Sequence, residues 1–201
     1  MKSYRINITE NDITCDTAHH YSGVGNISET PNIPCPNCHK QLFPVFNLSF
    51  KDPLLSELNL WNLEKANILT CPSCALYMEP YFISYNKTNI CVTGGHRDGG
   101  DIIQNIDTPY KARLIELITP DSLDDIPPHQ IGGNPPRDTN PLDCPNCSNT
   151  MGFFGIVAYD DLCVPLYENN GTPVSLIIGD NDCLIIHSCK SCNILGLTWL
   201  Y

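Results

Sequence analysis

Twelve cysteines give this 201-residue chain its clearest capacity for chemistry. Eight of them form four CxxC pairs, in which two residues separate two thiols. A CxxC turn can offer two thiolates to one ion, and zinc takes four such ligands in a tetrahedral structural site. The spacing therefore predicts eight zinc ligands, which are Cys35, Cys38, Cys71, Cys74, Cys144, Cys147, Cys189 and Cys192.

The order of the pairs along the chain groups them into two sites. The first site would use the pairs at 35–38 and 71–74, and the second site the pairs at 144–147 and 189–192. A crossed arrangement, in which the two sites exchange pairs, is the alternative, and it would produce one intertwined domain. Four sulfur ligands leave no open position for water on either ion, so we expect two structural zinc ions that perform no chemistry.

A redox role is the other use that proteins make of CxxC pairs. A thioredoxin-type site has one pair at the start of a helix, whereas here strand-like sequence follows each of four pairs. Three pairs have Pro after the first Cys, which suits a tight turn that directs its remaining N–H groups at sulfur. The fourth, CKSC, places Lys190 beside the thiolates, where a cation is favourable. We therefore favour structural metal sites.

The sequence that surrounds the pairs occurs twice. PCPNCHKQLFPVFNLSFKD at 34–52 aligns with DCPNCSNTMGFFGIVAYDD at 143–161, so that CPNC falls on CPNC and Met151 falls on Leu42. Each second pair is preceded by a short apolar lead and followed by a strand-like run. Each unit thus has the order pair, strand, insert, strand, pair, strand, which is typical of a zinc ribbon with an enlarged middle.

These repeats predict the fold class and the domain organisation. We expect a β-rich α+β protein with two zinc-ribbon-like units that arose by internal duplication and carry extended inserts. The N-terminal unit would cover residues 1–120, with its ribbon at 35–74. The C-terminal unit would cover residues 121–201, with its ribbon at 144–192.

The segments between the pairs have patterns of their own. Apolar residues alternate in 42–50, which predicts a strand in which Pro44 marks an edge or a bulge. Residues 51–69 are turn-like and then partly helical, and their large apolar side chains are expected to cover the ribbon. Residues 81–93 predict two strands around a turn, while residues 108–120 fit a helix or a strand.

Other cysteines and histidines have fewer possible partners. Cys91, Cys163 and Cys183 lie beside apolar residues and are expected to be buried free thiols. Cys15, His19 and His20 could form a third ligand set. This set would lack a fourth ligand and a CxxC turn, so we do not expect it to bind a metal.

One further residue and one further segment could be taken for functional sites. His187 comes just before the last pair and is expected at most to support the metal ligands. The segment GGHRDGGD at 94–101 lacks the spacing of a phosphate-binding loop, so a surface hairpin is expected there.

The charge balance restricts the class of partner. The chain has 22 acidic and 11 basic residues, a net charge of −11, which repels nucleic acid and favours a basic protein. Lys40 and Lys190 are nearly the only cations beside the pairs, so we expect no nucleic-acid binding. No stretch approaches the roughly 20 apolar residues that span a bilayer, and the first residues have no apolar run typical of a signal peptide. We therefore expect a cytoplasmic protein with no membrane partner.

HQIGGNP at 129–135, followed by CPNCSNTMGFFGIV, resembles the YwqG-like family of bacterial proteins. Members of that family typically combine an H-x-[LI]-G-G-x-P turn, a CxxC pair with an apolar strand, and a Gly-Asp element before a late CxxC pair. Gly179 and Asp180 would supply that element here. The resemblance is best over about residues 126–201, and the first unit also resembles zinc-binding members. The resemblance implies a fold and no particular activity, because the family has no settled activity.

The same turn is more distantly similar to one in the eukaryotic programmed cell death protein 2 group, although this chain has Arg137 where that motif has Trp. Those proteins are thought to chaperone a ribosomal protein, so the resemblance implies a chaperone-like interaction. Within the turn, Gly132 and Gly133 are expected to need a positive φ or a close backbone approach. We expect His129 to lock the turn, because no nucleophile or carboxylate stands at a spacing that would complete an acid–base set.

Three hypotheses for function follow. We favour a non-catalytic, zinc-stabilised interaction module that binds a basic protein. An antitoxin-type immunity protein is the second hypothesis, since such a protein would also be acidic and bind a partner. The third is an enzyme that uses the His129 turn or the segment 94–101. The sequence indicates no oligomeric state.

Overall fold

The structure, a computed structural model, is built almost entirely of antiparallel β-strands. The β-rich fold predicted from the sequence is confirmed, and α1 (Pro53–Leu58) is the single α-helix among the described residues. The structure describes residues 2–12, 19–21, 33–71, 79–86, 89–95, 108–109, 113–119, 129–136, 139–158, 167–169, 172–174 and 183–200.

The strands that these residues form are mostly short. Two strands occur in the stretch 81–93, as predicted, and the ambiguous stretch 108–120 contains strands. The strands are β1 (Ser3–Asp12), β2 (His20–Tyr21), β3 (Phe43–Ser49), β4 (Lys65–Thr70), β5 (Tyr81–Tyr85), β6 (Ile90–Gly94), β7 (Thr108–Pro109), β8 (Arg113–Ile118), β9 (His129–Gly132), β10 (Gly152–Ala158), β11 (Tyr167–Asn169), β12 (Thr172–Val174), β13 (Cys183–Cys189) and β14 (Ile194–Leu200).

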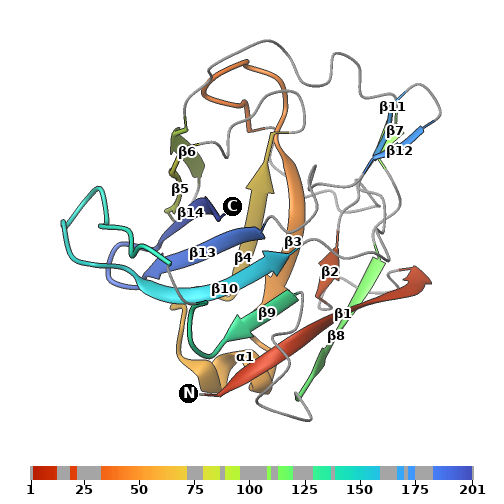
Figure 1. The fold of residues 1–201 in the computed structure, drawn as a ribbon, viewed down its shortest axis with the longest axis horizontal. Coiled ribbons are helices and arrows are strands. Elements are labelled where there is room, and N and C mark those ends of the chain that lie inside the picture. The colour runs from red at the N-terminus through yellow and green to blue at the C-terminus, as the bar shows by residue number, and fades with distance from the viewer. Residues whose placement is uncertain are drawn as a thin grey trace.

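Most strands join one eleven-stranded sheet, in the order β4-β3-β2-β8-β1-β9-β10-β13-β14-β5-β6 (Figure 1). A second sheet of three strands has the order β12-β11-β7. The large sheet contains strands from both predicted units, because β9, β10, β13 and β14 lie between β1 and β5. The ladder between β14 and β5 pairs Leu195 with Ile83. The division of the chain at residue 120 stays a prediction, and the sheet runs across it without a break.

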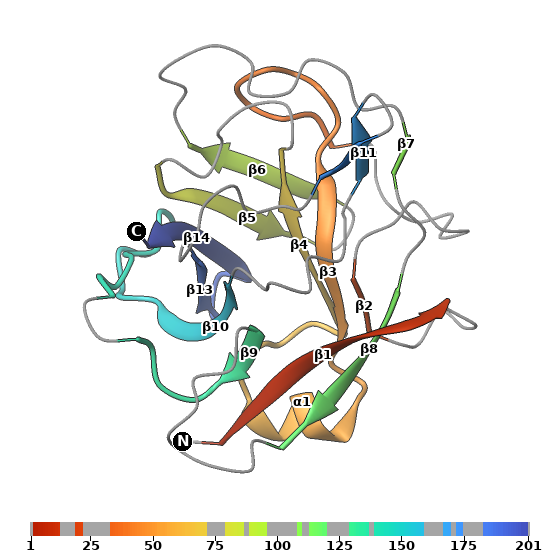
Figure 2. The ribbon, with the colours of Figure 1, turned by 45° about the vertical axis from the view of Figure 1, so that its right-hand side comes forward.

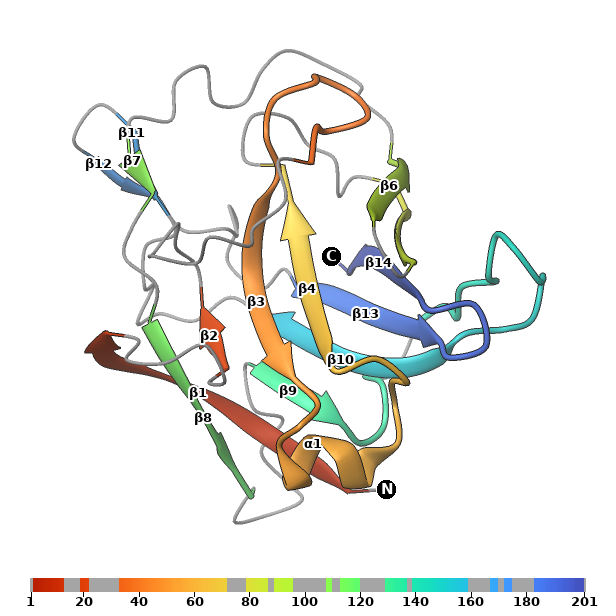
Figure 3. The ribbon, with the colours of Figure 1, turned by 180° about the vertical axis from the view of Figure 1, so that it is seen from behind.

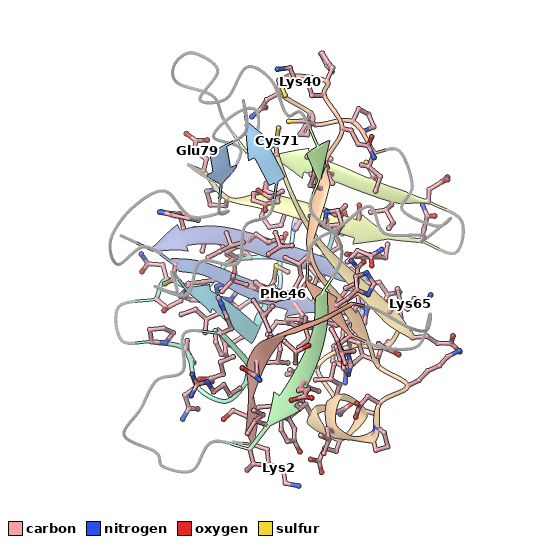
Figure 4. The ribbon with its side chains drawn as sticks, turned by 90° about the vertical axis from the view of Figure 1, so that its right-hand side faces the viewer. Lys2, Lys40, Phe46, Lys65, Cys71 and Glu79 are labelled. Atoms are coloured by element: carbon pink, nitrogen blue, oxygen red, sulfur yellow. The ribbon has the colours of Figure 1, made fainter. Side chains whose placement is uncertain are left out.

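The main core lies where the sheet curls over itself. β3 and β4 cross β10 and β13, as Figures 2 and 3 show from two sides. The ring centroids of Phe50, which follows β3, and Phe154, on β10, are 5.9 Å apart. Phe46 on β3 is fully buried and lies in the middle of the molecule in Figure 4. Side chains from both halves of the chain therefore form one hydrophobic core.

Two tyrosines satisfy backbone groups of β4, which is an edge strand of the sheet. Tyr81 donates its hydroxyl to the carbonyl oxygen of Leu69 at 2.8 Å. The N–H of Asn67 donates to the hydroxyl oxygen of Tyr85 at 3.0 Å, and that hydroxyl also donates to the Asn67 carbonyl. Burial raises the pKa of Tyr85 far above its ordinary value, so the hydroxyl keeps its proton. These bonds replace part of the ladder that a further strand would provide.

The helix α1 is short, and both of its ends are capped. Asp52 accepts a hydrogen bond from the N–H of Leu54 at 2.8 Å, and Pro53 occupies the first helical position. Asn59 has a φ of 51° and ends the helix in the left-handed conformation. Leu55 is the buried residue of the helix. After Asn59 the chain leaves the helix and runs toward the second half of the chain.

Candidate metal centres

Four cysteines of the C-terminal half lie in one compact group. The sulfur atoms of Cys144, Cys147, Cys189 and Cys192 are all within 4.8 Å of one another, and the four residues are free thiols. The sulfur atoms of Cys147 and Cys189 are 3.7 Å apart. A tetrahedral ion with bonds of about 2.3 Å to sulfur needs sulfur atoms about 3.8 Å apart. The group therefore has the dimensions of a site for one metal ion.

A tight turn places Cys144 and Cys147 on the same side of the backbone. The N–H of Cys144 donates to Asn149 O at 2.9 Å, and the N–H of Ser148 donates to Cys144 O at 2.8 Å. Ser148 has a φ of 57°, which reverses the chain. The side chain of Thr150 closes the turn with a hydrogen bond of 3.1 Å to Asp143.

The other two thiols come from the end of β13 and the turn that follows it. Burial works against ionisation of Cys189, but hydrogen bonds from the Ser191 hydroxyl and the Cys192 N–H outweigh it and lower the pKa of Cys189 to about 7. The hydrogen bond to Cys147 and burial raise the pKa of Cys192 to about 12. Without a cation, Cys189 ionises more readily than Cys192. A metal ion that binds all four must therefore displace protons.

Three cysteines of the N-terminal half form a second group. The sulfur atoms of Cys35, Cys38 and Cys71 lie within 4.8 Å of one another, and those of Cys38 and Cys71 are 3.4 Å apart. The N–H of Asn37 points at the Cys35 sulfur at 3.4 Å, as expected for a turn that stabilises thiolate charge. Cys74, the fourth ligand predicted for this site, lies outside the described residues.

The first turn of each group has the same hydrogen bonds. In the first group the N–H of Cys35 donates to Lys40 O at 2.7 Å, and the N–H of His39 donates to Cys35 O at 3.0 Å. The residues that form the corresponding hydrogen bonds in the second group each lie 109 residues further along the chain, which is also the separation between Cys35 and Cys144. His39, with a φ of 61°, corresponds in this way to Ser148.

The strands that follow these turns also correspond. β3 pairs with β4 and β10 pairs with β13, both antiparallel, and each ladder contains a register shift after its second residue pair. The shifted residues are Val45 and Phe154, and both are fully buried. The irregularity that Pro44 predicted is therefore present, and it directs an apolar side chain into the core in both copies.

The cysteine groups form within each half of the chain, so the described residues adopt the uncrossed arrangement. The first turn, at 33–42, and the second turn, at 142–151, lie on different sides of the molecule (Figure 1). Figure 4 shows Lys40 and Cys71 close together at one end of the molecule and Lys2 at the other. The two groups would therefore hold separate ions.

His19, one of the residues considered for a third ligand set, has a structural role. His19 accepts a hydrogen bond at Nδ1 from the N–H of Ser49 at 3.0 Å, so its proton lies on Nε2, 3.1 Å from the Asp52 carboxylate. Asp52 also caps α1, and His19 thus ties that cap to β3. In the part of the chain that the structure describes, neither His19 nor His20 belongs to a metal-ligating group. Cys15 lies outside the described residues.

The Gly-Gly turn after β9 has the backbone conformation that the sequence predicted. Gly132 and Gly133 have φ values of 74° and 81°. A Cβ atom on Gly132 would lie 2.8 Å from Lys2 O, and the N–H of Gly133 donates to that same oxygen at 2.9 Å. His129 is buried with its ring 5.8 Å from that of Phe46. The turn is packed against the start of β1.

Among the remaining residues, one prediction was wrong. Cys91 is exposed on β6, because it lies on the outward face of an edge strand whose inward residue is Val92. Cys183 is buried, as predicted. Cys163 and residues 96–101 of the glycine-rich segment lie outside the described residues.

His187 does not support the metal ligands by a hydrogen bond to any described residue. Both ring nitrogens are buried without a hydrogen-bond partner among the described residues, and burial lowers the pKa of the imidazole. Its ring stands edge-on to Phe153, with centroids 6.5 Å apart. In the matching ladder of the first unit, Leu69 occupies this position.

The sequence did not indicate which residues surround the second group. Phe82 of β5 packs against it together with Met151 and Ile194. Asn59 and Asn62, from the segment after α1, bind Lys190 in its last turn. These contacts join the N-terminal half of the chain to the C-terminal half, so no local sequence pattern could have predicted them.

The chain matches no family model, no curated protein and no solved structure. Among the described residues, no helix is both long and apolar enough to cross a membrane. The candidate site therefore stands on its own geometry, which is that of two cysteine groups placed to hold metal ions.

Proposed function

We propose that the protein is a non-catalytic, zinc-stabilised interaction module that holds two structural zinc ions and binds a basic protein partner. The observation that supports it most strongly is the group of four thiols with all sulfur atoms within 4.8 Å. Four sulfur ligands at tetrahedral spacing favour zinc or iron among biological metals. A complete set of four leaves no position for substrate or water, which favours a structural role.

The first centre has the same role in this proposal. Its three described thiols and the matching turn support a second zinc ion, with Cys74 as the fourth ligand on the basis of its spacing. The shared hydrogen bonds and register shifts support an origin of the two units by internal duplication. Membership of the YwqG-like family and a cytoplasmic location belong to the same proposal and rest on the sequence.

The class of partner follows from charge. A net charge of −11 attracts a basic surface over a range set by ionic strength. The packing of the Gly-Gly turn favours a structural role for it over a catalytic one, because Lys2, Ser3 and Leu58 fill the space beside Gly132 and Gly133. A chaperone-like interaction with a basic protein is the form that the distant resemblance implies.

Affinity purification from native cells tests this function. We expect the zinc-loaded protein to retain basic proteins at low salt and to release them as salt rises, because their attraction is screened. The metal-free protein should retain fewer of them. Turnover of a small molecule, with no protein retained at low salt, would contradict the proposal. A one-to-one complex with the toxin of a neighbouring gene would instead favour the immunity hypothesis.

A further inference from the structure

The last CxxC turn is held by side chains from the N-terminal half of the chain. Lys190 lies within this turn and donates from Nζ to Asn59 Oδ1 at 2.6 Å. The carbonyl oxygen of Lys190 accepts a hydrogen bond from Asn62 Nδ2 at 2.8 Å. One residue between two metal ligands is thus bound at both its side chain and its backbone.

The segment that makes these bonds, residues 59–62, is itself anchored. Leu60 O accepts a hydrogen bond from the Ser188 hydroxyl at 3.1 Å, just before the turn. Trp61 is only 6% exposed, and its ring packs edge-on against Phe154. Its Nε1 donates to Lys65 O at 3.1 Å. Segment 59–62 therefore connects the surface of the second centre with the hydrophobic core.

The other side of the turn is bound by β5. The N–H of Tyr85 donates to Asn193 O at 2.9 Å, which continues the β14–β5 ladder into the turn. Phe82, on the same strand, packs against the group that contains Cys144 and Cys189. Two separate segments of the N-terminal half thus contact the turn that carries the last two ligands.

We propose that segment 59–62 acts as a clamp on the second metal centre, so that docking of the segment and binding of the ion stabilise each other. The ion fixes the turn at Cys189 and Cys192, and the fixed turn presents Lys190 to Asn59 and Asn62. Loss of the ion would free the turn and weaken these bonds. Because such coupling is reciprocal, weakening the bonds must also weaken retention of the ion. This inference rests on the metal binding proposed above.

Thiol labelling of the intact, zinc-loaded chain tests the clamp. Excess chelator removes zinc in the presence of N-ethylmaleimide, and peptide mass spectrometry follows the labelling of each cysteine with time. In Asn62→Ala we expect Cys147 and Cys192 to be labelled about fivefold faster than in the wild type, which is what one hydrogen bond of about 1 kcal/mol contributes. Labelling of Cys38 serves as the internal reference and should keep its rate.

A matched control separates the clamp from general loosening of this region. Glu64→Ala breaks the exposed ion pair of 2.9 Å between Lys51 and Glu64, two residues beyond Asn62, without touching Lys190. We expect this variant to label like the wild type. Asn59→Ala and Lys190→Met should each speed labelling, and the acceleration in the double variant should be smaller than the product of the two single accelerations, because both remove the same bond.

The outcomes distinguish the clamp from the metal site. Equal labelling of Cys147 and Cys192 in wild type and Asn62→Ala, with zinc retained by both, would overturn the clamp and leave the proposed metal binding intact. Acceleration of Cys38 to the same extent would also overturn it, since the effect would be global. If zinc protects no thiol of the wild type, the proposed metal binding fails and the clamp fails with it.

Discussion

At the scale of single residues, β13 carries two cysteines in different surroundings. Cys183 and Cys189 lie at opposite ends of this strand and are 8% and 7% exposed. Cys183 packs with Ile156 and Ile185, whereas Cys189 lies in the four-thiol group. Equal burial on one strand makes the two cysteines a matched pair for testing what the metal contributes.

Replacement of each cysteine by serine should have very different effects. Cys189→Ser removes one of four ligands, so we expect it to lower the free energy of unfolding by about 4 kcal/mol or more, since loss of a metal is among the largest single effects known. Cys183→Ser should cost about 1 kcal/mol. Chemical denaturation of both variants under reducing conditions measures the difference. Similar losses for the two would show that the ligands are assigned wrongly.

His187 is a polar residue in a position that the first unit fills with Leu69. Its ring nitrogens are buried and have no hydrogen-bond partner among the described residues. A buried polar group without a partner costs about 1 to 3 kcal/mol. We therefore expect His187→Leu to raise the free energy of unfolding by about 1 kcal/mol at neutral pH, as measured by denaturation with zinc bound. Leu69→His is the reverse control and should destabilise; a less stable His187→Leu protein would contradict this account.

The two cysteine groups could be predicted at this scale because CxxC is a local signal. Two thiols three positions apart imply a turn, and four turns imply two ions, whatever the rest of the fold. Burial of Cys91 was predicted wrongly from its apolar neighbours, because the sequence does not show that β6 is an edge strand. That the His187 ring has no hydrogen-bond partner in the described part of the chain depends on packing between strands and has no sequence signal.

At the scale of elements, the backbone of the Gly-Gly turn can be tested against another glycine. Gly132 has a φ of 74° and a virtual Cβ 2.8 Å from Lys2 O, whereas the nearest atom to a Cβ on Gly152 would be 3.9 Å away. Gly132→Ala should therefore lower the free energy of unfolding by about 2 kcal/mol, and Gly152→Ala should change it by less than about 1 kcal/mol. Thermal unfolding of both variants gives the comparison. An unchanged stability of Gly132→Ala would contradict our explanation that this turn needs glycine because of its positive φ and its close approach to Lys2 O.

The repeated element was predictable in its turn and first strand and less so in its last strand. The alignment of 34–52 with 143–161 predicted matching turns and strands, and β3 and β10 correspond down to their register shifts. The strand after the second pair behaves differently in the two units. β14 pairs with β13, while β5 pairs with β14 and β6. The hydroxyls of Tyr81 and Tyr85 bond to β4, and the sequence gives no signal for this use of side chains.

At the scale of the whole molecule, one sheet and one core connect the two halves. β1 pairs with β9 and β5 pairs with β14, so each half completes the sheet of the other. Strand order could not be predicted, because it depends on contacts between residues far apart in the chain. We therefore expect disruption of either metal centre to destabilise the other half of the chain as well as its own.

The stoichiometry of bound metal tests the central claim most directly. Native mass spectrometry and elemental analysis of tag-free protein, purified under reducing conditions, should give two zinc ions per chain and no iron. Removal of the zinc by a chelator should then unfold the protein, because ion binding contributes to its folding free energy. Well under one equivalent of bound metal, iron in place of zinc, or an unchanged melting temperature after complete removal of the metal would contradict the account.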